Sequence, residues 1–394
     1  MINKRYEAML SEKDVIFEIF DYATQQIAKV GEDKVYNFSL GNPSVPAPAT
    51  VNEAIIRNVR EVDPLKLHSY SPGKGLPLAR EAMAAGLNKR YGSHYCGDNI
   101  FMTVSASGAL AHAFRAVAEP GDEILTFAPC FSEYVPYTAG AGLKLKVVPA
   151  DTETFQINFE AAEAMLTPEV SAVLVNSPNN PSGIVYSTET IQRLAALLRD
   201  KAAAFGHPIY LISDEPYRDI VFTGVDSPYI ANFYENTLTC YSFSKSLSIP
   251  GERIGYLAVN PECEGAATII DICPQISRTL GFNGAAGLMQ RVVAETCLDT
   301  ADLSVYEKNM RLLYDTLTDC GFTCVRPGGT FYMFPKSLEP DDFAFCEKAK
   351  TLNLMLVPGS IFGCPGHFRI AYCVPTEKVE AALPVFRQLA ALYK

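Results

Sequence analysis

Short apolar runs separated by longer helical patterns constrain this chain more than any other feature. The runs are almost continuously apolar and contain many β-branched residues, as is typical of strands buried on both faces of a parallel sheet. Helical patterns, such as residues 109–118 and 188–205, lie between them. This alternation predicts a doubly wound α/β domain over residues 46–290. The predicted strands cover residues 100–104, 123–127, 144–148, 172–176, 209–213, 238–242 and 254–259.

The pattern changes after about residue 285, and 394 residues are many for a single core. A long helical stretch is predicted from Gly287 to about Cys320. Short strands at 327–334, 355–358 and 368–373 and helices at 341–352 and 377–393 follow. We therefore expect a smaller α+β domain over residues 291–394. Residues 1–45 include a predicted helix near Lys13–Lys29 and are expected to pack against this domain.

Composition excludes several classes of partner. The net charge of −11 argues against nucleic-acid and anionic-membrane surfaces. No apolar run is long enough to span a bilayer, and the N-terminal residues lack the pattern of a secretory signal. The 11 cysteines are irregularly spaced and the five histidines do not cluster with them. We expect a cytoplasmic protein with reduced thiols, no metal site and neither a nucleic-acid nor a membrane partner.

A lysine lies in a serine-rich stretch directly after the predicted strand at 238–242. The stretch runs from Ser242 to Arg253 and places Lys245 between two serines. An amine at the end of a buried strand can form a Schiff base with an aldehyde cofactor. The hydroxyls and Arg253 can hold a phosphate beside it. The alternative is a solvated surface lysine in a serine-rich loop.

Three further motifs follow predicted strands. Residues 105–107 open a predicted helix, where backbone N–H groups and the helix dipole favour a phosphate, although a serine N-cap has the same sequence. Asn180 lies in a turn that contains two prolines and a glycine. This rigid turn either presents the Asn180 side-chain amide at the end of the strand or only connects two elements. Asp214, three residues before Tyr217, ends a strand, where a carboxylate pairs with a pyridinium nitrogen or caps a helix.

One arginine, Arg369, interrupts the otherwise apolar run at 368–373. A buried arginine requires an anionic partner. That partner is either a substrate carboxylate or an internal Asp or Glu.

Taken in order, these motifs resemble those of the class I aminotransferases among the fold-type I pyridoxal 5′-phosphate (PLP) enzymes. The resemblance includes Leu40-Gly41-Asn-Pro-Ser-Val-Pro46 and Tyr70-Ser-Pro-Gly-Lys-Gly75, and it covers nearly the whole chain. It implies a large PLP-binding α/β domain, with a mostly parallel seven-stranded doubly wound sheet, and a smaller α+β domain.

The resemblance also implies roles for individual residues. Lys245 forms the internal aldimine with PLP and shuttles the α-proton of the substrate. Asp214 keeps the pyridine nitrogen protonated, while Tyr217 and Asn180 bind the phenolic oxygen. Arg369 holds the substrate carboxylate with Asn180 and the Gly41 backbone. The other implied contacts are the phosphate ligands Ser105, Ala106, Ser107, Ser242 and Arg253, the stacking ring of Phe131, and Tyr70, which reaches the phosphate of the neighbouring subunit in a homodimer.

Departures from the family pattern leave the accepted side chain open. Ser105 stands where a glycine often starts the phosphate turn, and Ser107 stands where some aspartate-using relatives carry a lysine. Others carry a tryptophan in place of Phe131, and this chain has no tryptophan. Three basic residues either pair with a distal carboxylate of the substrate or lie on the surface as solvated side chains: Lys66, Lys74 and Arg278.

We therefore expect an aminotransferase that moves an amino group between an L-amino acid, with aspartate first, and a 2-oxo acid such as 2-oxoglutarate. Aromatic amino acids and alanine are alternative donors. A PLP-dependent carbon–sulfur β-lyase uses the same lysine and aspartate, and ammonia and pyruvate released from cystathionine without an oxo acid would favour it. A non-enzymatic PLP-binding regulator would carry an N-terminal DNA-binding domain, for which about 45 residues and a negative charge leave little room.

Overall fold

A seven-stranded sheet forms the centre of the computed structural model, which describes residues 2–10 and 15–394. The strand order is β2-β8-β7-β6-β5-β3-β4, and β8 runs antiparallel to both of its neighbours while the other pairs are parallel. Each strand overlaps a predicted one, so the prediction of a mostly parallel seven-stranded sheet is confirmed. The strands are β2 (Ile100–Thr103), β3 (Glu123–Phe127), β4 (Lys144–Val148), β5 (Val170–Asn176), β6 (Tyr210–Asp214), β7 (Thr237–Ser242) and β8 (Gly255–Val259).

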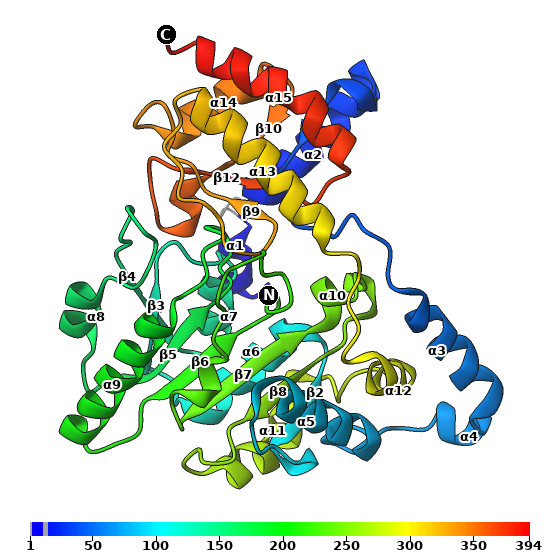
Figure 1. Cartoon of the computed structure of the whole chain (residues 1–394). Coiled ribbons are helices and arrows are strands. Elements are labelled where there is room, and N and C mark those ends of the chain that lie inside the picture. The colour runs from blue at the N-terminus through cyan, green and yellow to red at the C-terminus, as the bar shows by residue number, and fades with distance from the viewer. Residues whose placement is uncertain (1, 11–14) are drawn as a thin grey trace.

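Helices cover both faces of this sheet (Figure 1). In β5, Ala172 and Leu174 pack in the cluster that contains the α6 and α11 side chains, whereas Val173 and Val175 pack in the cluster that contains α9. Because both faces are buried, the strand sequence is apolar throughout and does not alternate. The helices are α3 (Ala49–Glu61), α4 (Pro64–Leu67), α5 (Pro77–Tyr91), α6 (Ser105–Val117), α7 (Tyr134–Gly140), α8 (Phe159–Met165), α9 (Thr188–Phe205), α10 (Phe243–Ser246), α11 (Ala266–Leu280) and α12 (Gly287–Thr296).

The C-terminal elements form a second hydrophobic core with the segment around Phe38. A three-stranded antiparallel sheet has the order β11-β12-β9, and β1 pairs in parallel with β10, which joins the N-terminal segment to the C-terminal elements. The predicted domain boundaries at residues 45 and 290 stay a prediction. The remaining helices and strands of the chain are α1 (Lys4–Met9), α2 (Val15–Val30), β1 (Tyr36–Asn37), α13 (Ser304–Asp319), β9 (Tyr332–Met333), α14 (Asp342–Lys350), β10 (Leu354–Met355), β11 (Val357–Pro358), β12 (Phe368–Ala371) and α15 (Thr376–Ala391).

The continuous helix predicted from Gly287 to Cys320 is wrong, because α12 and α13 are separate. The side chains of α12 pack in the large-sheet cluster with α3 and α5, whereas those of α13 pack in the C-terminal core. Between them, the Ala301 amide donates to the Ser246 carbonyl at 2.7 Å. The chain therefore leaves one core for the other while it contacts the turn that follows Lys245. The start of the helix predicted at Lys13 lies outside the described residues.

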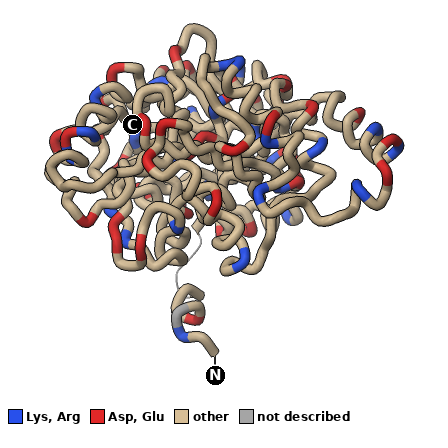
Figure 2. The backbone as a smooth tube through the Cα atoms, turned by 90° about the horizontal axis from the view of Figure 1, so that it is seen from below, with Lys and Arg blue, Asp and Glu red and all other residues tan. Residues whose placement is uncertain are grey.

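Charged residues are distributed over the molecule. Figure 2 shows Lys and Arg interspersed with Asp and Glu, and it shows α1 projecting from the body of the molecule. No helix in the described parts of the chain has the length and apolar composition needed to cross a bilayer. All the cysteines are free thiols, and most are buried.

Candidate active site

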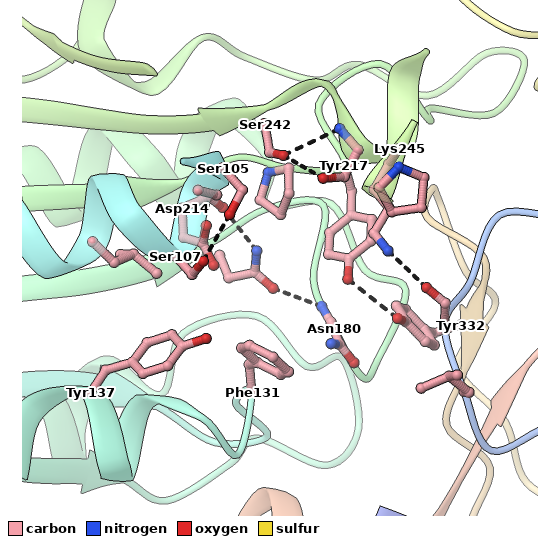
Figure 3. Close-up of a pocket in the computed structure, with 18 of the residues that line it drawn as sticks. Ser105, Ser107, Phe131, Tyr137, Asn180, Asp214, Tyr217, Ser242, Lys245 and Tyr332 are labelled. Carbon is pink, nitrogen blue, oxygen red and sulfur yellow. Dashed lines mark hydrogen bonds between the residues drawn. The ribbon is translucent and has the colours of Figure 1, made fainter. Parts of the chain in front are cut away.

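A cavity of about 270 Å³ lies at the C-terminal ends of the parallel strands, beside the smaller core. Asn176 of β5, Asp214 of β6 and Ser242 of β7 are the last residues of their strands, and all three line it. Open α/β sheets bind ligands at this edge. Figure 3 shows Asp214, Ser105 and Ser107 across the pocket from Lys245, Tyr217 and Tyr332. The predicted site residues that line it are Gly41, Ser105, Ala106, Ser107, Phe131, Asn180, Asp214, Tyr217, Ser242, Lys245, Arg253 and Arg369.

Lys245 extends into this cavity from the short helix α10. The Ser242 side chain caps that helix by accepting from the Ser244 amide, which fixes the chain directly before the lysine. Lys245 Nζ donates to the Gly41 carbonyl at 2.7 Å. No ion pair of Lys245 occurs among the described residues, and burial lowers its pKa to about 8. A large fraction of the amine is therefore neutral in mildly alkaline solution, so it can act as a nucleophile.

A cradle for an anion lies at the N-terminus of α6. Arg253 Nη2 donates to Ser105 Oγ at 2.7 Å and to Ser107 Oγ at 3.5 Å, and the two hydroxyls are 2.7 Å apart. Ser105 and Arg253 both have left-handed backbones, with φ of 67° and 50°. Such conformations are costly for residues other than glycine and cluster at functional sites. Hydroxyls, a guanidinium and a helix N-terminus together favour a phosphate group.

Close backbone packing holds this cradle in place. A Cβ atom on Gly255 would lie 2.2 Å from the Tyr241 carbonyl oxygen and 2.9 Å from the Ser105 carbonyl carbon. Only glycine permits strand β8 to approach the start of α6 so closely. The sequence Arg253-Ile-Gly255 therefore supplies both the cation and the close contact that positions it.

Asp214 is buried, with 4% of its surface exposed. The Tyr134 hydroxyl donates to Oδ2 at 2.6 Å, whereas Oδ1 has no hydrogen-bond partner in the described structure. Burial raises the pKa of this carboxyl to about 7, against the opposing effect of the Tyr134 hydrogen bond. Residues 216–219 form a turn and no helix follows Asp214, so the interpretation of Asp214 as a helix cap is wrong. The unpartnered oxygen is suited to a cationic hydrogen-bond donor in the cavity.

Arg369 is a buried cation on β12, with 2% of its surface exposed. Its Nη1 donates to Asn180 Oδ1 at 3.0 Å and its Nη2 to the Ser39 carbonyl at 2.6 Å. Neither acceptor carries a charge, and no Asp or Glu of the described residues pairs with Arg369. The alternative in which an internal Asp or Glu pairs with Arg369 is therefore wrong for the described residues. Burial lowers the pKa of Arg369, as expected for a cation that is removed from water without an anionic partner.

Three residues of the site escaped the sequence analysis as functional candidates. Tyr332 follows the glycine-rich segment, and its hydroxyl lies 3.2 Å from that of Tyr217. Asn176 bridges two strand ends, because its Nδ2 donates to the Asp214 carbonyl at 2.8 Å and its Oδ1 accepts from the Asn180 amide at 2.7 Å. Tyr134 bonds to Asp214. A strand-end polar residue was a usable signal for Asn176 alone.

Tyr70 is the predicted site residue that does not line the cavity of its own chain. Its side chain is fully exposed. The three candidate partners for a distal carboxylate are also elsewhere: Lys66 is exposed, Lys74 pairs with Asp271 at 2.5 Å, and Arg278 donates to Gln275 at 2.8 Å.

Comparison with known proteins agrees with this geometry. The family model described as aminotransferase class I and II matches residues 33–386. Aspartate aminotransferase from Thermotoga maritima is 30% identical over 92% of this chain and 93% of its own length. A solved aminotransferase from Eubacterium rectale is 43% identical, with a TM-score of 0.97 over 100% of this chain and 99% of its own. Thermus thermophilus aspartate aminotransferase, solved with maleate, is 26% identical, with a TM-score of 0.86 over 99% of each chain.

The chain belongs to the aminotransferase class I and II family. Members of this family are fold-type I transaminases that use pyridoxal phosphate, so the fold, the enzyme class and the cofactor expected from the resemblance are confirmed. The residues present also fit that cofactor. Its aldehyde requires an amine such as Lys245, its phosphate an anion cradle, and its pyridinium nitrogen an acceptor such as the unpartnered oxygen of Asp214.

Proposed function

We propose that this transaminase moves the amino group of aspartate to a 2-oxo acid, with 2-oxoglutarate as the acceptor. The observation that carries the proposal is that the carboxylate-free Arg369 lies in the same cavity as the Lys245 amine. An α-amino acid has a carboxylate that Arg369 can bind and an α-proton that Lys245 can remove. Relatives named aspartate aminotransferase support the choice of donor.

The side chains have distinct tasks in this proposal. When bound, the cofactor supplies an electron-withdrawing ring that stabilises negative charge at the α-carbon. Lys245 would hold the cofactor through its aldehyde, and its amine would move the proton at the substrate's α-carbon. Asp214 stays ionised against the ring nitrogen. Arg369 binds the α-carboxylate through its planar fork, with Asn180 orienting the guanidinium.

The remaining contacts complete the site. Tyr217, held by Tyr332, donates toward the cofactor's phenolic oxygen. Phe131 would cover one face of the cofactor's ring, and its own ring meets that of Tyr134 edge-on at 5.6 Å. The phosphate is held by the backbone and hydroxyls at the start of α6, with further ligands from the β7–β8 connection: Ser105, Ala106, Ser107, Ser242 and Arg253.

We also infer that the enzyme is a cytoplasmic homodimer in which Tyr70 reaches the phosphate of the neighbouring subunit. The exposure of Tyr70 and its absence from the cavity lining of its own chain support this arrangement. Sedimentation analysis measures the dimer directly. Mixing Tyr70→Ala with Lys245→Ala chains tests the shared site, because one of the two sites in a hybrid dimer regains both residues. A monomer, or a mixture without regained activity, contradicts the arrangement.

A donor panel tests the substrate. Each amino acid is supplied with 2-oxoglutarate, and glutamate formation is measured; aspartate is expected to give the highest kcat/KM, with oxaloacetate as its product. The described cations of the cavity lining are Lys245, Arg253 and Arg369, each of which already has a task. None of these three is left for the distal carboxylate of aspartate, so the choice of donor depends on the relatives' names, and a preference for alanine or phenylalanine would overturn the aspartate assignment. Ammonia and pyruvate from cystathionine without an oxo acid would instead identify a β-lyase.

A further inference from the structure

The carboxylate of Asp214 is oriented by one side chain that lies outside the cavity. Tyr134 is completely buried and does not line the pocket, yet its hydroxyl is 2.6 Å from Asp214 Oδ2. The other carboxylate oxygen, Oδ1, has no partner among the described residues. A carboxylate with one oxygen bound and one free has a defined direction in which it accepts a further hydrogen bond.

The position of Tyr134 is itself fixed by packing. It is the first residue of α7, and its amide donates to the Phe131 carbonyl at 3.1 Å. Its carbonyl accepts from Thr138 Oγ1 at 2.8 Å. The ring lies in the same hydrophobic cluster as Leu110 and Cys130. A phenol held this firmly loses little conformational entropy when it holds the carboxylate.

We propose that Tyr134 is a positioning residue for the reaction: its hydroxyl fixes one oxygen of Asp214, so that the other accepts from the cofactor's ring nitrogen and the carboxylate stays ionised. The inference rests on the proposed function and adds a residue that touches neither substrate nor cofactor. It also identifies the hydrogen bond that opposes the effect of burial on the pKa of this carboxyl.

The electrostatics of the pair agree with this role. Burial and the negative charge of Asp214 raise the pKa of Tyr134 well above 10, so its hydroxyl stays protonated and donates. Burial and, to a smaller extent, the charge of Glu215 raise the pKa of Asp214 to about 7, against the lowering effect of the Tyr134 hydrogen bond. The titratable groups around this carboxylate are Tyr134 and Tyr137 of α7, Glu215 and Tyr217 after β6, and Cys240 of β7.

The test compares Tyr134→Phe with the wild-type holoenzyme. Loss of a hydrogen bond to a charged group is expected to raise the dissociation constant of the cofactor about 10- to 100-fold. Binding requires an ionised Asp214 and is lost as the pH falls through the pKa of that carboxyl. Since the substitution raises that pKa, the acid limb of cofactor binding, followed by visible absorbance, is expected to move to higher pH.

Tyr234→Phe is the matched control. The Tyr234 hydroxyl is also buried and donates to the Ile209 carbonyl at 2.7 Å, and neither residue lines the cavity. Its loss is expected to lower the melting temperature as Tyr134→Phe does, without shifting the pH limb or the cofactor affinity. Equal effects of the two substitutions on cofactor binding would overturn the proposal.

A double-mutant cycle separates positioning from a merely structural effect. In an Asp214→Asn background, Tyr134→Phe is expected to cause no further loss of cofactor affinity; additive losses would refute the role. If Tyr134→Phe does not fold, 3-fluorotyrosine at position 134 keeps the shape of the side chain and donates a stronger hydrogen bond. The acid limb of cofactor binding is then expected to move to lower pH. A limb that does not move counts against the proposal. If wild-type protein neither retains the cofactor nor transaminates, the proposed function itself fails. If only the Tyr134 variants behave as the control does, this inference alone fails.

Discussion

Replacement of Arg369 by glutamine is expected to separate activity from stability. The guanidinium is buried with two uncharged acceptors and an unpartnered Nε. Truncating one partner of a buried, hydrogen-bonded charge pair costs about 2–5 kcal/mol, so kcat/KM for the amino acid is expected to fall roughly 30- to 4,000-fold. Most of the loss is expected as a higher KM, because the α-carboxylate is held both before and during the chemistry.

The folded protein without substrate is expected to lose little stability through the same change. Burial of an uncompensated cation is unfavourable, as the lowered pKa of Arg369 indicates, and glutamine removes this cost while keeping a donor for the Asn180 side chain. Steady-state kinetics and thermal unfolding are measured together. Arg369→Lys keeps the charge without the planar fork, and Arg193→Gln, at an exposed position of α9, is the control. An unchanged KM would refute the reasoning, as would a melting temperature that falls in proportion to the activity.

Three further predictions concern the cofactor. Lys245→Ala is expected to abolish transamination and the visible absorbance of the bound cofactor; normal turnover would disprove the assignment of the lysine. The pKa of Asp214 rises from 3.8 to about 7 on folding, so the folded protein without cofactor holds a proton that the unfolded chain releases, and stability is expected to fall as the pH rises from about 4 to 7. Asp214→Asn should flatten that decline in urea unfolding and weaken cofactor binding; an unchanged slope would contradict the shift. Gly255→Ala is expected to lower both the melting temperature and the affinity for the cofactor's phosphate, because its Cβ would lie 2.2 Å from the Tyr241 carbonyl oxygen. Gly251→Ala serves as the control, since its Cβ would meet no atom within 4 Å. Equal behaviour of the two variants would show that the backbone moves freely at Gly255.

Local signals predicted the large sheet well. The helix predicted at residues 188–205 agrees with α9 at both ends, because Ser187 caps the Thr190 amide and Gly206 takes the left-handed conformation that ends the helix. Apolar runs marked the strands because both sheet faces are covered. Polar residues at strand ends marked the cavity, since parallel strands end at one edge.

Tertiary contacts accounted for what the sequence did not predict. The break between α12 and α13 follows a change of core, and the sequence carried a local signal for it that the prediction passed over: Asp299, Thr300 and Asp302 favour caps and turns. Tyr134 precedes Asp214 by 80 residues, and Tyr332 follows Tyr217 by 115. No spacing rule pairs residues at such separations, and a buried tyrosine looks like an ordinary core residue in the sequence.

The antiparallel strand β8 gives the site a modular construction. Ser242 and Gly255 face each other in the β7–β8 pairing, so the covalent anchor Lys245 and the phosphate ligand Arg253 lie on one excursion of the chain with both ends fixed on adjacent strands. The distance between Lys245 and Arg253 therefore depends on the short segment 242–255, whereas the other phosphate ligands, Ser105, Ala106 and Ser107, come from α6. Exchange of residues 242–255 as a unit between homologous enzymes should preserve the relative positions of Lys245 and Arg253. Insertions or deletions within this segment should displace both residues together.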